Sequence, residues 1–99
     1  MSTKILPYNV IVQLYSNETE VEVTRLCNAV TIRNVGDTIG YINGIVLLPS
    51  PGAGLSGESV SFGGNEGEVY KGRLSIIFGV PVLNPLMEVT QKYYLDEQR

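Results

Sequence analysis

The chain has 99 residues, of which 43% are apolar, and its formal net charge is −3. This length suits one domain with a thin core, and it leaves no room for a second domain. The negative charge and the scatter of the seven basic residues argue against a nucleic-acid partner, because phosphate binding needs clustered Lys and Arg. We therefore assign residues 1–99 to a single domain and expect 1–4 and 96–99 to be frayed tails.

The first third of the chain reads as strands separated by polar turns. Residues 5–15 predict a long strand that carries Val10, Val12 and Leu14 on one side. A polar turn is expected over 17–20. The alternating segments 21–24 and 29–35 then predict two further strands.

The clearest local signal is Asn43-Gly44 between apolar residues. Asn and Gly tolerate the positive φ of a two-residue type I′ turn, so residues 41–46 predict a β-hairpin. A loop rich in Gly, Pro and Ser is expected from Ser50 to Gly57. Further strands are expected at 59–62, 69–70, 74–78 and 87–95, with a loop at 63–67.

Short strands with regular turn signals define the fold class. We predict an all-β domain, an antiparallel β-sandwich or jelly-roll-like fold of seven or eight short strands. No amphipathic helical stretch of ten or more residues is present in the sequence.

Several kinds of chemistry are disfavoured by residue types. The chain has no histidine, which removes the commonest general base and the usual zinc and copper ligands. The one cysteine, Cys27, cannot form an internal disulfide, and we expect it to be a small buried apolar residue. No apolar segment approaches the ~20 residues of a membrane helix, and no signal-peptide pattern is present at Met1. We expect no enzyme activity, cofactor, metal, membrane partner or small-molecule substrate.

Residues Gly52 to Gly57 match the G-x-G-x-x-G pattern of nucleotide sites. Such motifs need a helix directly afterwards, and here a strand is predicted. Glu58 occupies the position of the phosphate-binding lysine and would repel a phosphate. We interpret this segment as a surface loop.

The acidic residues Glu66 and Glu68 allow two other interpretations. They could be calcium ligands together with Asn65, or a pair of catalytic carboxylates. Three side chains supply too few oxygens for a calcium site, and spacing alone does not fix a carboxylate separation. A solvated loop between strands is the interpretation that we favour.

The middle of the chain resembles a known family. Residues 30–37, the hairpin at 41–45, Leu48-Pro49 and the segment 57–68 are similar to small β-sandwich structural proteins of tailed bacteriophages, of the crAss-like kind that infects gut Bacteroidetes. This chain departs by inserting residues between Pro49 and Gly57. The resemblance covers about forty residues. It implies a capsid decoration or head-associated subunit in the virion, made in the host cytoplasm, without cofactor or reaction.

The expected partners are other copies of the chain, as a homo-oligomer, or other virion proteins. A disulfide-free β-sandwich has sheet edges to cover, and association would cover them. The loop at 50–57 and the first strand are expected to reach neighbours. The alternative is a carbohydrate- or protein-binding module, although Trp is absent. The candidate interaction surface comprises Pro49, Pro51, Gly52, Leu55, Asn65, Glu66, Tyr93 and Tyr94.

Overall fold

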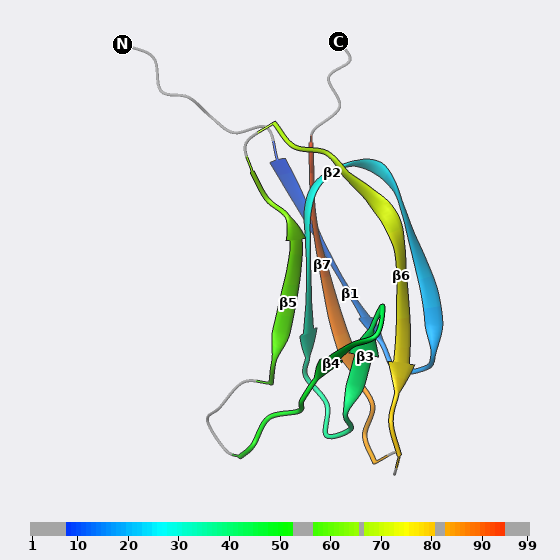
Figure 1. Cartoon of the computed structure of the whole chain (residues 1–99). Coiled ribbons are helices and arrows are strands. Elements are labelled where there is room, and N and C mark those ends of the chain that lie inside the picture. Colours follow the sequence, from blue (N-terminus) through cyan, green and yellow to red (C-terminus); the bar gives the residue numbers. More distant parts are fainter. Residues whose placement is uncertain (1–7, 53–56, 66, 81–82, 95–99) are drawn as a thin grey trace.

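The fold is all-β and antiparallel, as the sequence predicts. The computed structural model describes residues 8–52, 57–65, 67–80 and 83–94. These residues form one sheet of seven strands, drawn in Figure 1. The strands are β1 (Tyr8–Tyr15), β2 (Thr19–Asn34), β3 (Gly40–Ile42), β4 (Ile45–Leu47), β5 (Ser59–Gly63), β6 (Tyr70–Phe78) and β7 (Met87–Tyr94).

Strand β2 belongs to two layers at once. Its residues Thr19–Val23 pair with β6, whereas Cys27–Asn34 pair with β7 and Ala29–Arg33 also pair with β5. The register shifts between Val23 and Cys27, where the strand changes partners. Figure 1 shows β2 arching over the top of the molecule between the two layers. One layer has the order β1-β7-β2-β5, and the other has the order β2-β6-β3-β4.

Two strand boundaries predicted from the sequence were wrong. Segments 21–24 and 29–35, predicted as separate strands, are parts of the continuous β2. Segments 69–70 and 74–78 likewise join as β6. The reason is that residues 24–28 contain neither Gly nor Pro, so the chain changes direction by an irregularity within a strand instead of by a turn.

The core lies between the two layers. It is built mainly from β2, β6 and β7, in which buried residues largely alternate with more exposed ones because side chains alternate between the faces of a sheet, and β3 and β4 add one residue each. Eleven apolar residues of the described chain are buried there and form one cluster: Val23, Cys27, Val30, Ile32, Ile42, Leu47, Leu74, Ile76, Phe78, Met87 and Val89.

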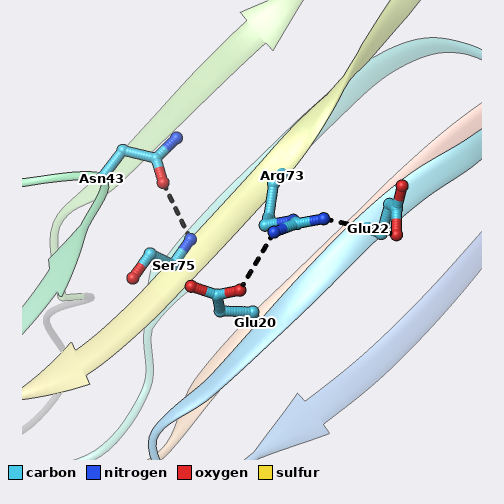
Figure 2. Close-up of polar contacts among 5 residues, drawn as sticks. All are labelled: Glu20, Glu22, Asn43, Arg73 and Ser75. Carbon is cyan, nitrogen blue, oxygen red and sulfur yellow. Dashed lines mark hydrogen bonds and ion pairs between the residues drawn. The ribbon is translucent and has the colours of Figure 1, made fainter.

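The predicted hairpin is confirmed. Asn43 and Gly44 have φ of 51° and 85°, and Ile42 pairs with Ile45 across a two-residue turn. Figure 2 shows that the Asn43 side chain also reaches β6, where its Oδ1 accepts the Ser75 amide at 2.8 Å. The Asn43 amide donates to the Ser75 carbonyl at 3.0 Å in return. The turn residue therefore extends the pairing of β3 with β6.

A buried asparagine holds the loops at the other end of β2. The Nδ2 of Asn34 donates to the carbonyls of Thr38 and Leu47 at 2.8 and 2.9 Å, and its Oδ1 accepts the Gly36 amide. Asn34 is wholly buried, so these bonds satisfy a side chain that would otherwise destabilise the fold. They attach the 35–39 turn and the end of β4 to the central strand.

We expect Gly57→Ala to destabilise the domain. A Cβ at Gly57 would lie 2.0 Å from the Asn34 carbonyl oxygen, which belongs to the backbone and cannot move aside cheaply. The expected loss is about 2 kcal/mol of unfolding free energy, or a Tm lower by roughly 10 °C in thermal circular dichroism.

The matched control is Gly52→Ala in the same loop. Among the described residues, nothing lies within 4 Å of a Cβ at Gly52, so the Tm of this variant should stay near the wild-type value. Equal Tm values for the two variants would contradict the close approach of Gly57 to β2.

Candidate functional site

The residues predicted to form an interaction surface do not lie together. Pro49, Pro51 and Gly52 are in the loop before β5, where Pro49 is half-buried and the other two are exposed. Asn65 follows β5 at its opposite end. Leu55 and Glu66 lie outside the described residues. The structure therefore divides the predicted surface into two parts, separated by the length of β5 (Figure 1).

At the Asn65 end, the buried side-chain amide of Asn28 lies within hydrogen-bond distance of three other groups. The Nδ2 of Asn28 lies 2.8 Å from the Asn65 carbonyl, 3.1 Å from the Glu68 carbonyl and 3.2 Å from the Tyr94 hydroxyl. The Tyr94 hydroxyl donates to the Glu68 carbonyl at 2.8 Å. Asn28 is wholly buried, so this cluster fastens the 64–69 loop to β2 and β7.

The two tyrosines at the end of β7 both make contacts within the chain, so they do not form the exposed contact surface that was predicted. Tyr93 packs against the core cluster. Tyr94 is half-buried, and its hydroxyl is held within the Asn28 cluster. The structure thus gives Tyr94 a role in holding a loop. No sequence signal marked this role, because Asn28 lies between the two segments predicted as strands, 21–24 and 29–35.

Glu68 and Glu58 each accept a hydrogen bond from a backbone amide at the other end of their own loop. The Glu68 carboxylate accepts the Asn65 amide at 3.0 Å, and the Glu68 amide donates to the Asn65 carbonyl. Glu58 pairs with Leu48 in the same manner, because its carboxylate accepts the Leu48 amide at 2.9 Å. Strand β5 begins at Ser59, directly after Glu58, which confirms the strand predicted there. Within the described ranges, no group of three or more His, Cys, Asp or Glu residues could hold a metal.

Oppositely charged side chains of β2 and β6 lie close together on the outer face of the layer β2-β6-β3-β4. The Arg73 guanidinium lies 3.5 Å from the Glu20 carboxylate and 3.8 Å from that of Glu22, as Figure 2 shows. All three side chains are about 60% exposed, so these pairs contribute little to stability. They partly neutralise the positive charge that Lys71 and Arg73 place on β6. An open hollow lies beside them, lined by Glu22, Val23, Lys71, Gly72 and Arg73.

Cys27 is buried, which confirms the prediction. Its side chain is 0% exposed, and its thiol donates to the Ala29 carbonyl at 3.2 Å. Burial raises the pKa of the Cys27 thiol, because a thiolate would lose its hydration there. The group is therefore a poor nucleophile at neutral pH.

The outer side of β1, the strand expected to reach neighbours, exposes three aliphatic residues that are not among the predicted interaction residues. Val10, Val12 and Leu14 are 55%, 52% and 59% exposed, whereas Ile11 and Tyr15 on the other side are half-buried. The alternation was visible in the sequence, but it does not say which side faces the core. Three aliphatic side chains in a row on a solvent-facing strand are unusual and are candidates for contact with another molecule.

A second exposed apolar row crosses the other layer. Tyr41 is paired with Val46 on one side and with Ile77 on the other, so the three share the outer face of β4, β3 and β6. Val46 and Ile77 are 47% and 46% exposed. Each outer face of the molecule therefore carries apolar side chains.

No protein-family model matches the chain, and no match was found among curated proteins or among solved structures. In the part of the chain that the structure describes, no helix is long and apolar enough to cross a membrane.

We expect Asn28→Ala and Tyr94→Phe to be energetically coupled. Removing the Asn28 amide takes one of two donors from each of the Asn65 and Glu68 carbonyls, and it should lower the unfolding free energy by about 1–3 kcal/mol. The double variant should lose less than the sum of the two single losses, by about 0.5 kcal/mol or more in urea unfolding.

Tyr41→Phe is the control for loss of a hydroxyl, because the Tyr41 hydroxyl makes no hydrogen bond to the described residues. It should leave stability near wild type. Strict additivity of Asn28→Ala and Tyr94→Phe would show that the two side chains do not act as one cluster.

The unfolding free energy should fall in alkaline solution because of the raised pKa of the Cys27 thiol. Its pKa is raised in the folded state, so the unfolded chain loses the thiol proton first. The corresponding stability is fully present below the ordinary pKa of about 8.5 and is lost as pH rises toward the folded-state pKa. Urea unfolding between about pH 7.5 and 9.5 should show this decline in wild type and a flatter profile in Cys27→Ala. Parallel profiles would contradict it.

Proposed function

We propose that this chain is a non-enzymatic structural subunit of a larger protein assembly. The particular form that we propose is a bacteriophage virion component, such as a capsid decoration or head-associated subunit. Its partners would be further copies of itself or other virion proteins, which it would meet after synthesis in the host cytoplasm. The virion setting is supported only by the resemblance of the middle forty residues.

The observation that carries the assembly proposal is the amount of exposed aliphatic surface. Among the described residues, thirteen large apolar side chains are at least 36% exposed, against eleven apolar residues buried in the core. Single exposed aliphatic residues are ordinary, but grouped ones mark contact surfaces. The thirteen are Val10, Val12, Leu14, Leu26, Val35, Ile39, Ile45, Val46, Leu48, Val69, Ile77, Val80 and Leu83.

These side chains are distributed in a manner that suits a subunit with several neighbours. The β1 row lies on one outer face, and the row of Val46 and Ile77 lies on the other. Val80 and Leu83, in the connection from β6 to β7, are 87% and 70% exposed. A ligand-binding module would instead gather its contact residues around one concave site.

The placement of the carboxylates also favours a structural role. Glu58 and Glu68 each bind a backbone amide of their own loop, and Glu20 and Glu22 face Arg73. Each of these acids has a partner that explains its position without a reaction.

The test is the absolute mass of the wild-type protein, measured by light scattering coupled to size exclusion. We expect a discrete oligomer whose proportion rises with protein concentration, because exposed apolar rows become buried on association. Two loadings that differ about tenfold in concentration should separate a closed oligomer from open-ended aggregation. A strict monomer at both loadings would contradict self-assembly.

A further inference from the structure

The edges of the sheet differ in how they are protected from pairing. An unpaired strand invites another chain, and proteins block such edges with charges, short strands or irregular backbone. β4 has three residues. β5 has five, presents Ser59 and Ser61 on its outer side, and ends at Gly63 with φ of 78°. The Thr19–Val23 part of β2 pairs with β6 on one side, and no described strand pairs with its other side. This part carries the charged residues Glu20 and Glu22.

β1 has none of these protections. It is eight residues long, pairs regularly with β7 at every position, and contains no charged residue. Among the described residues, no strand pairs with its other side. It is therefore the one edge of the described sheet that is long, regular and uncharged at the same time.

The hydrogen-bonding groups of this edge face outward at the even-numbered residues. The Val10 amide donates to the Oδ1 of Asn9 at 3.1 Å, a local contact that an amide directed at β7 would not make. Backbone groups alternate direction along an antiparallel strand, so those of Val12 and Leu14 face the same way as those of Val10. The edge thus presents three acceptors and three donors, of which the Val10 amide is already bound to Asn9, on the residues that also carry the exposed aliphatic side chains.

The row is self-complementary when β1 meets a second β1 in the antiparallel direction. With Val12 opposite its own copy, Val10 of each chain lies opposite Leu14 of the other, so all three aliphatic residues meet an aliphatic residue. A shift by two positions places Leu14 opposite Tyr8 or leaves Val10 without an aliphatic partner. A shift by one is excluded, because it would join the outer face of one copy to the inner face of the other.

Charge does not oppose this register, and it adds little to it, because the charged residues concerned lie three strand spacings of about 4.8 Å apart. On β7, Lys92 is paired with Val10 and Glu88 with Leu14. The centred register therefore places Lys92 of one copy and Glu88 of the other at the two ends of the same row. No like charges lie in these rows between β7 and its symmetry copy.

We propose that β1 pairs antiparallel with β1 of a second copy of this chain, about a two-fold axis at Val12. The layer β1-β7-β2-β5 then continues into the same layer of the partner, and the aliphatic rows of both copies form one patch. This interface rests on the proposed function, since it names the contact by which the subunit associates with itself. Such a contact is isologous, so any closed oligomer that uses it contains an even number of chains.

The first experiment compares Val12→Lys with Ser59→Lys by light scattering at several concentrations. Both residues are exposed, and they lie on β1 and β5, the two opposite edges of the same layer, so both variants add the same charge to an edge strand. Val12→Lys places two lysines opposite each other at the axis and removes two buried valines. It should raise the dissociation constant on the order of 100-fold or more. Ser59→Lys should keep the wild-type mass.

The second experiment tests the register by cross-linking. Directly opposite hydrogen-bonded residues have Cα atoms about 5.5 Å apart, within the range that a disulfide spans. Under mild oxidation, Val12→Cys should link to itself. Val10→Cys should not link to itself, but should link when mixed with Leu14→Cys. Native Cys27 is buried and should not interfere.

The outcomes separate this interface from the broader proposal. A wild-type oligomer that Val12→Lys leaves intact, or that Val12→Cys fails to link, would overturn pairing through β1 while leaving self-assembly standing. An oligomer with an odd number of chains would also overturn it. A wild-type monomer at every concentration would overturn both.

Discussion

The fold depends on the continuity of β2. This strand pairs with β6 through its first part and with β7 and β5 through its second part, so it belongs to both layers. The buried Asn28 and Asn34 lie on its second part and hold the loops at the two ends of the sandwich. Because these bonds have partners only while β2 lies between its neighbours, the loops and the core depend on the same strand.

The same arrangement determines which surfaces remain for contact. With β2 and β7 in the centre of the first layer, β5 and β1 become its edges. β5 is short and ends in an irregular backbone, whereas β1 is long, uncharged and apolar on its outer side. A thin two-layer domain has few ways to bury more apolar surface within one chain. The proposed association at β1 would supply that burial, which connects the structure to the proposed assembly role.

Local chemistry made part of this structure predictable. The Asn43-Gly44 turn, the buried Cys27 and the strand after Glu58 followed from backbone and solvation preferences of single residues. The continuity of β2 was not predictable, because a strand that changes partners at an irregularity has no turn residue to mark it. The candidate site was predicted less well. The role of Tyr94 depends on Asn28, which lies 66 residues earlier in the chain, and alternation in β1 does not reveal which side is solvated.

The most direct test of the account is amide hydrogen exchange along β1, measured by NMR at a low and a high protein concentration. The amides of Val12 and Leu14 should exchange quickly in the dilute sample and slowly in the concentrated one, because pairing with a second copy would bond them. The amide of Ile32, within β2, should be slow in both. Fast exchange of Val12 and Leu14 at both concentrations would contradict the claim that this edge is where the subunit associates.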